Sequence, residues 1–164
     1  MSYLGLDPQK TGMTAEYLNL LLADYHVYYQ NLRNFHWNVK GEQFFPLHEK
    51  FEELYSDART RIDDLAERIL SLRYAPLSSM SAYLEKSSMS EAAFYLSDRE
   101  MVATLLKNHE ILISDMRNVL QVAAEANDEG TVDMISGFLG YLEKESWMLD
   151  AWFTRKKVKE MIEA

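Results

Sequence analysis

Apolar residues recur at three- and four-residue intervals along four long stretches of the sequence, which is the period of an amphipathic α-helix. The first stretch spans residues 14–39 and the second residues 46–73, the third begins at residue 97, and the fourth runs from near residue 131 towards the end of the chain. The second shows the pattern most clearly, with an apolar row made of Leu47, Phe51, Leu54, Ala58, Ile62, Leu65, Ile69 and Leu72. The pattern predicts an all-α protein with four long helices.

Residues with known capping preferences mark the boundaries of these helices. Thr14 is a suitable N-cap for the first helix, so residues 1–13 are expected to form a short N-terminal extension. Pro46 lies where the first turn of the second helix is predicted. Ser97 and Glu100 form a capping-box pair at the start of the third helix.

The lengths of the connections predict the topology. The first two helices are joined by a few residues, as are the last two, so each pair should form an antiparallel hairpin. The connection at 74–96 is much longer and contains a short amphipathic piece at 80–85, where we expect a short helix. Two helical hairpins joined by one long crossover form the ferritin-like four-helix bundle. We therefore predict that residues 1–164 form a single domain with this fold.

Four metal-ligand residues, His48, Glu52, Asp63 and Glu67, lie on one side of the second predicted helix, and His36 lies near the end of the first. At about 100° per residue, the first three fall within roughly 60° of one another and the fourth lies about 40° further round. The apolar row of the same helix is centred roughly 120° away. We therefore expect a metal site beside the bundle's own core. The alternative is a solvated flank of the helix.

Distances along the helix axis constrain this site further. His48 and Glu52 are one turn apart, as are Asp63 and Glu67, so each pair could converge on one ion. From His48 to Glu67 is about 28 Å of helix, whereas metal–ligand bonds are about 2 Å long. If both pairs form one site, two chains must contribute across a two-fold axis. Each site would then combine His36, His48 and Glu52 of one subunit with Asp63 and Glu67 of the other.

Composition excludes several other kinds of site. The sequence contains no Glu-x-x-His pair, which argues against a di-iron centre in the bundle core. It contains no cysteine, so thiolate metal sites and disulfides are excluded. The net charge of -9 disfavours nucleic-acid binding by the whole surface; it either attracts metal cations or simply maintains solubility. We find no signal peptide or bilayer-spanning segment and expect a cytoplasmic protein.

Three segments, Asn34–Gly41, Phe44–Phe51 and Ile62–Arg68, closely resemble the Dps family of DNA-binding proteins from starved cells, or mini-ferritins, in the ferritin-like superfamily. The resemblance implies a shell of twelve subunits with ferroxidase sites between subunits. It also implies oxidation of Fe(II), preferably by hydrogen peroxide, and storage of Fe(III) mineral inside the shell, which protects the cell against oxidative stress.

The resemblance also implies a ligand set. His36, His48, Asp63 and Glu67 stand at family ligand positions with the family's residue types, whereas Glu52 stands where the family usually has Asp. These five residues are therefore expected to be both the metal ligands and the catalytic residues, with iron as the metal. Trp37 also matches the family; it either intercepts oxidising radicals beside the iron or is a packed interface aromatic.

The same resemblance suggests roles for acidic residues elsewhere in the chain. Glu49 and Glu53 are candidate nucleation carboxylates or simply solvated surface. The family builds negatively charged pores near the turn that carries Glu125, Asp128, Glu129 and Asp133. Asp133 is the first choice for a pore residue, and Asp128 either joins it or begins the turn.

The resemblance leaves DNA binding open, and the residues disfavour it. The N-terminal segment has Lys10 as its only base, and the cluster of Arg155, Lys156, Lys157 and Lys159 is typical of a helix end that complements its dipole. His109 lies on an apolar row and is expected to be a hydrogen-bonded core residue; His26 is assigned no role. The alternative function is a non-enzymatic nucleoid-binding shell protein with a structural metal site.

Overall fold

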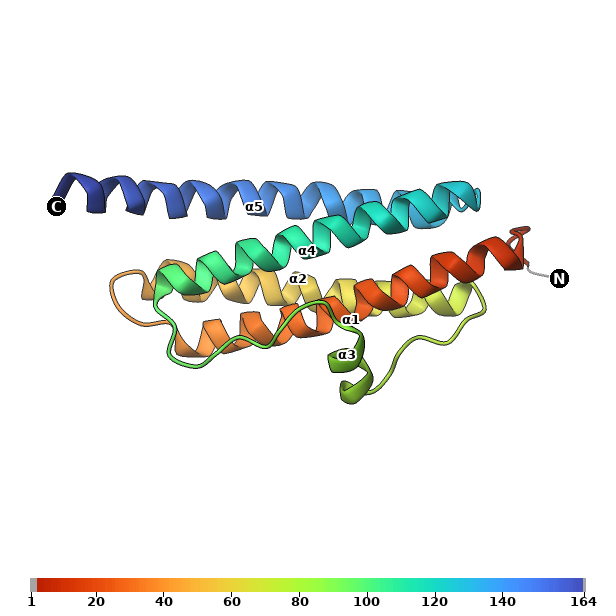
Figure 1. Ribbon diagram of the computed structural model, residues 1–164, viewed down its shortest axis with the longest axis horizontal. Helices are drawn as coiled ribbons and strands as arrows, with labels where there is room; N and C mark the ends of the chain where they lie inside the picture. The colour runs from red at the N-terminus through yellow and green to blue at the C-terminus, as the bar shows by residue number, and fades with distance from the viewer. Residues whose placement is uncertain (1–2, 164) are drawn as a thin grey trace.

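The computed structural model describes the backbone of residues 3–163 and the side chains of residues 3–154. The described chain contains the helices α1 (Pro8–Asn38), α2 (Phe44–Ser71), α3 (Met80–Lys86), α4 (Asp98–Glu125) and α5 (Glu129–Glu163). Helices α1 and α2 form one antiparallel hairpin and α4 and α5 form a second, with α1 packed against both α2 and α4 (Figure 1). The predicted four-helix bundle with one long crossover and a short helix within it is confirmed.

The first helix begins earlier than the sequence pattern predicted. Its N-cap is Asp7, whose side chain accepts a hydrogen bond from the Gln9 backbone N–H at 2.9 Å, and Pro8 follows in the first turn. Thr14 is fully buried inside the helix, so the assignment of Thr14 as N-cap is wrong and residues 8–13 of the expected extension are helical. An Asp-Pro start combines a strong cap with a proline already in helical geometry, which outweighs threonine at the later position.

The other boundaries follow the sequence closely. Ser97 and Glu100 form both hydrogen bonds of the predicted capping box, and Pro46 lies in the first turn of α2. Helix α4 ends before Asn127, which adopts a left-handed φ of 53°, as residues following a helix often do.

The crossover between α2 and α4 runs along the outside of the bundle and is tied to α1 (Figure 1). Asp24 of α1 is 1% exposed, and its Oδ1 accepts hydrogen bonds from Ser87 Oγ at 2.6 Å and from the backbone N–H groups of Ser88 and Met89 at 2.7 and 3.2 Å. Three donors from the crossover converge on one buried carboxylate oxygen of α1. Asp24 is thus the main polar anchor of this part of the crossover.

Asp115 of α4 meets the same carboxylate. Burial raises the pKa of Asp115, and a hydrogen bond to Asp24 together with the charge of Asp24 raises it further, to about 7. Two carboxyl groups can share a hydrogen bond only while one of them keeps its proton. Because the raised pKa belongs to Asp115, the proton of the pair resides on Asp115. The pair joins α1, α4 and the crossover.

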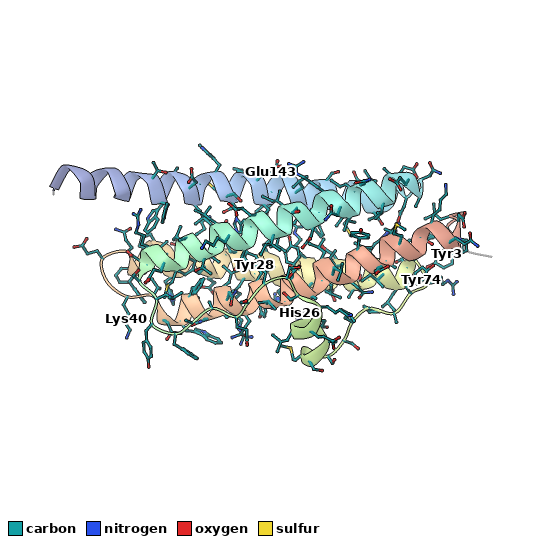
Figure 2. The ribbon with its side chains drawn as sticks, viewed as in Figure 1. Tyr3, His26, Tyr28, Lys40, Tyr74 and Glu143 are labelled. Atoms are coloured by element: carbon teal, nitrogen blue, oxygen red, sulfur yellow. The ribbon has the colours of Figure 1, made fainter. Side chains whose placement is uncertain are left out.

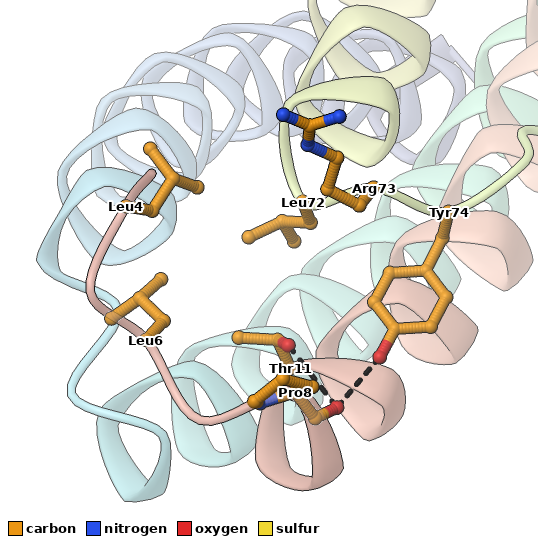
Figure 3. Close-up of a pocket in the computed structure, with 7 residues that line it drawn as sticks. All are labelled: Leu4, Leu6, Pro8, Thr11, Leu72, Arg73 and Tyr74. Atoms are coloured by element: carbon orange, nitrogen blue, oxygen red, sulfur yellow. Dashed lines mark hydrogen bonds between the residues drawn. The ribbon is translucent and has the colours of Figure 1, made fainter. Parts of the chain in front are cut away.

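The start of α1 also contacts the end of α2. The Tyr74 hydroxyl donates to the Pro8 carbonyl at 2.6 Å, and Gly12 leaves room for the phenol ring, since an added Cβ would lie 3.2 Å from the Tyr74 oxygen. An open pocket of about 410 Å³ beside this contact is lined by Leu4, Leu6, Pro8, Thr11, Leu72, Arg73 and Tyr74 (Figure 3). This lining contains no carboxylate or imidazole and so offers no metal-ligand set.

Aromatic packing fixes the opposite end of the hairpin. Phe35 of α1 and Phe51 of α2 are fully buried, with ring centroids 5.9 Å apart. Gly41, in the connecting turn, adopts a left-handed φ of 92°, which glycine tolerates without strain. These contacts hold the end of α1 beside the beginning of α2.

None of the helices, as far as the structure describes them, is long and apolar enough to cross a membrane.

Candidate metal site

His36 and His48 lie side by side where α1 ends and α2 begins. Their ring centroids are 3.8 Å apart at an interplanar angle of 20°. His36 is 9% exposed and His48 is half-buried, with the ring of Phe44 stacked against His48 at 4.9 Å. The structure therefore brings together two of the residues that the sequence placed in the site.

Reciprocal hydrogen bonds fix the orientation and tautomer of both rings. Nδ1 of His36 lies 2.8 Å from the backbone oxygen of His48, and Nδ1 of His48 lies 2.8 Å from the backbone oxygen of His36. A carbonyl oxygen only accepts, so each Nδ1 must carry the hydrogen and donate it. In the neutral ring this tautomer has its lone pair on Nε2, which is the form in which imidazole binds a metal ion.

Tyr55 completes this end of the site, although the sequence pattern did not single it out. Its ring meets the edge of His36 at 5.3 Å, and its hydroxyl donates a long hydrogen bond of 3.4 Å to Oε1 of Glu52. Burial raises the pKa of Tyr55, and the Glu52 charge and hydrogen bond add to it. The phenol therefore remains protonated and acts as a donor that orients Glu52. Its spacing from Glu52 on the same helix face was the available signal.

Glu52, Asp63 and Glu67 are exposed on α2. Asp63 and Glu67 follow the histidine end by several helical turns, so one chain does not bring them to His36 and His48. Among the residues whose side chains are described, no three His, Asp or Glu side chains are grouped closely enough to hold a metal ion. Within one chain, the predicted ligands thus form a histidine end and a separate acidic end.

The chain is similar to known proteins over most of its length. Residues 15–158 match the family model described as Ferritin-like domain. The chain is 44% identical over 140 residues to the "DNA protection during starvation protein 2" of Bacillus anthracis, covering 85% of this chain and 96% of that protein. A similarly named protein of Brevibacillus brevis is also 44% identical over 140 residues, which cover 85% of this chain and 94% of that protein.

A solved structure shows the same relationship in three dimensions. The Dps protein from Vibrio cholerae O1 matches with a TM-score of 0.90 and 42% sequence identity, over 93% of this chain and 97% of that one. The chain belongs to the Dps family. The Vibrio cholerae protein is described as a member of a broad superfamily of ferritin-like diiron-carboxylate proteins.

Trp37 and Lys50 lie near the histidine end of this Dps chain, and each interacts with charged side chains. Trp37 is 58% exposed, and the Arg33 guanidinium lies 4.7 Å from its ring centroid. Lys50 pairs with Glu53 at 2.7 Å and with the buried Glu145 at 3.2 Å. The charge of Glu53 is thus partly neutralised, which weakens its case as a nucleation carboxylate.

The acidic residues at the turn between α4 and α5 include one that is buried and three that are exposed. Asp128 is 1% exposed, forms an ion pair with Arg68 of α2, and accepts hydrogen bonds from the N–H and hydroxyl of Thr131. Of the two roles considered for Asp128, the structure supports the second, because its carboxylate is buried and caps the start of α5. Asp133, like Glu125 and Glu129, is exposed.

The remaining histidines lie away from the metal site. His109 is a buried, hydrogen-bonded core residue, as predicted. His26 stacks on Tyr83 with ring centroids 3.7 Å apart. The side chains of the basic cluster at 155–159 lie outside the described residues.

Proposed function

We propose that this Dps-family chain is an iron-sequestering ferroxidase. Its substrates are Fe(II) and, preferentially, hydrogen peroxide, and its product is Fe(III), stored as mineral inside a shell of twelve subunits. The orientation of the two histidines is the observation that carries the proposal. A histidine that only packs in the core, or that lies on a solvated helix face, does not require a hydrogen bond at Nδ1. Here both rings have one, and in the neutral rings both Nε2 lone pairs are then available to a metal ion.

Each site combines two chains. His36, His48 and Glu52 of one subunit face Asp63 and Glu67 of the other across a two-fold axis. Two features support this arrangement: the chain separates its own ligands by many ångströms, and the acidic end on α2 is exposed. An isologous interface would supply two equivalent sites per dimer, because each chain offers both halves.

The ligand types suit iron that is bound, oxidised and released. Two nitrogens and several carboxylate oxygens hold Fe(II), and the oxygen donors favour the harder Fe(III). Two Fe(II) ions lose one electron each, and one hydrogen peroxide takes up both electrons and two protons to form two waters. Paired delivery of electrons avoids release of hydroxyl radical. Exposed Asp133 near the start of α5 would help to attract cations to the shell.

The protein is expected to work in the cytoplasm as a homo-oligomer and without DNA. The net charge of -9 opposes binding to phosphate, which depends on lysine and arginine displacing counterions. A shell protein with a purely structural metal, such as zinc, is the competing function.

Anaerobic loading of the purified protein with Fe(II), followed by peroxide, tests the proposal. We expect rapid ferric absorbance, little spin-trapped hydroxyl radical, and a particle near twelve times the 19.1 kDa chain mass. The double variant His36→Leu, His48→Leu should lose the fast phase and keep the particle size. The matched control is His26→Leu, because His26 is a half-buried histidine outside the site.

Two results would contradict the proposal. Unchanged kinetics in the double variant would refute the assignment of the site. An assembled wild-type protein that binds zinc at His36 and His48 but does not respond to Fe(II) and peroxide would support the structural-metal alternative.

A further inference from the structure

A chain of three hydrogen-bonded polar side chains, two of them buried, crosses the interior of the bundle away from the metal site. Tyr28 of α1 and His109 of α4 are 2% and 1% exposed, and Tyr28 Oη lies 2.8 Å from His109 Nε2. The other ring nitrogen of His109, Nδ1, lies 2.8 Å from Oγ of Ser146 on α5. Figure 2 places Tyr28 midway along the bundle.

The hydrogen bonds in this chain have a definite direction. Ser146 Oγ donates to the Leu142 carbonyl at 2.7 Å, which uses its only hydrogen. Ser146 must therefore accept from His109, so Nδ1 carries the ring hydrogen and Nε2 has a lone pair. The Tyr28 hydroxyl donates to that lone pair. A phenol is thus held against a neutral imidazole that can accept its proton.

The surroundings allow this proton to move only together with an electron. Burial raises the pKa of Tyr28 well above its usual value and lowers the pKa of His109 to about 3. At neutral pH both groups are uncharged, and neither ionises alone. Removing an electron from the phenol turns it into a strong acid, which even a weak base such as this imidazole deprotonates. The negative charges of Asp57 and Glu145, which also raise the pKa of Tyr28, offset the positive charge then formed on His109.

Aromatic rings connect the metal site to this pair. Tyr55 contacts His36 at 5.3 Å and Tyr29 at 6.1 Å, and Tyr29 adjoins Tyr28 in α1. His36 and Tyr28 are eight residues apart in one helix, which is about 12 Å along the axis. The rings of His36, Tyr55 and Tyr29 are in contact one after the other, and the last step to Tyr28 is between consecutive residues of one helix.

We propose that Tyr28 is a one-electron donor with His109 as its proton acceptor, and that the pair consumes hydroxyl radical formed when peroxide meets a single ferrous ion at the metal site. The source of that oxidant rests on the proposed function; the redox activity of the pair does not.

The step balances as follows. Tyr28 loses one electron and its O–H bond breaks, while a new N–H bond forms at Nε2 of His109. The electron passes along the aromatic rings to the hydroxyl radical, which becomes hydroxide and takes a proton from solvent to form water. A further Fe(II) then returns one electron and becomes Fe(III), and the proton moves back from His109 to Tyr28.

An iron-free experiment tests the pair itself. The metal-free assembled protein, labelled with ¹⁵N-histidine, is oxidised by a flash-excited ruthenium tris(bipyridine) complex with persulfate and frozen for electron paramagnetic resonance. We expect a tyrosyl radical with a ¹⁵N coupling and with an exchangeable proton coupling that disappears in D₂O. Tyr28→Phe, which keeps the ring and its packing, should remove this coupled signal.

Tyr83→Phe is the matched control. Tyr83 also touches a histidine ring, that of His26, but its hydroxyl donates to the Leu77 carbonyl at 2.8 Å. This variant should keep the coupled signal. Equal loss of signal in both variants, or a wild-type radical with no nitrogen coupling, would overturn the proposal. The wild-type isotope measurement decides the matter even if Tyr28→Phe does not assemble.

A second arm supplies the oxidant through iron. With substoichiometric Fe(II) and excess peroxide, the same radical should appear, and Tyr28→Phe should release severalfold more spin-trapped hydroxyl radical than the wild type. Suppose the photochemical arm gives the coupled radical, but the iron arm gives neither iron oxidation nor a radical. That result would refute the proposed function and leave Tyr28 as a redox-active residue. Normal iron oxidation without the coupled radical in either arm would remove the Tyr28 proposal alone.

Discussion

The Asp24–Asp115 pair makes the stability of the protein depend on pH in an unusual direction. A carboxyl group whose pKa is raised by folding contributes stability that is present at low pH and is lost as pH rises through the folded pKa. For Asp115 that loss begins above the ordinary value of 3.8 and is complete once the pH passes about 7. We therefore expect the wild-type protein to lose this contribution progressively as the pH rises from about 4 to about 7, and to show no further loss from Asp115 above that.

The size of the effect follows from the shift. Moving the Asp115 pKa from 3.8 to about 7 corresponds to about 4 kcal/mol at 1.36 kcal/mol per unit. Asp115 is only half-buried, so solvent screening reduces this, and we expect about 1–2 kcal/mol per chain. In Asp115→Asn, the amide can donate to Asp24 at every pH, so this contribution should no longer depend on pH in this range.

Differential scanning calorimetry of the assembled protein at fixed concentration, from pH 5 to 8.5, measures the effect. The melting temperature of Asp115→Asn should exceed that of the wild type at pH 8, and the difference should shrink towards pH 5. Asp150→Asn serves as the control, because Asp150 is an exposed aspartate on α5. Parallel pH profiles for the wild type and Asp115→Asn would refute the assignment of the shared proton.

Three further predictions concern other parts of the chain. Arg68→Gln leaves the buried Asp128 carboxylate without its charge partner and should destabilise the fold by about 3 kcal/mol; thermal melting measures this, and a melting temperature equal to that of the wild type would contradict a stabilising role for the ion pair. Ser97→Ala should cost about 1 kcal/mol through loss of the N-cap. Hydrogen bonds from Ser97 lower the pKa of Glu100, so the wild-type advantage is present at neutral pH and should fade as pH drops below 4.5; circular dichroism across that range tests it. Tyr55→Phe should slow peroxide-driven iron oxidation roughly two- to tenfold, at or below the low end of effects typical of groups behind metal ligands, because its bond to Glu52 is long; stopped-flow absorbance measures this, and an unchanged rate would remove the positioning role.

Local sequence signals were sufficient to predict most of the fold. The capping box at Ser97 and Glu100 and the proline at 46 depend on neighbours a few residues away, and both appear where expected. The early start of α1 was also encoded locally, in Asp7 and Pro8. The predicted start was placed at Thr14 because the apolar periodicity begins there. Periodicity identifies a helix more reliably than it identifies the helix ends.

Features that depend on distant residues could not be predicted in the same way. Asp128 looked like part of an acidic surface because its partner, Arg68, lies 60 positions away. The tautomers of His36 and His48 depend on the two backbones meeting across a turn. Helical spacing did identify the ligand types and their two separate groups, which is why the candidate site could be anticipated without its hydrogen bonds.

The reciprocal bonds between His36 and His48 have a consequence for how this site tolerates change. Each imidazole is held by a main-chain oxygen, which every amino acid possesses, so replacing one ring does not remove the support of the other. Natural variants with a single histidine should therefore keep that ring correctly aimed and lose affinity for the ion in steps.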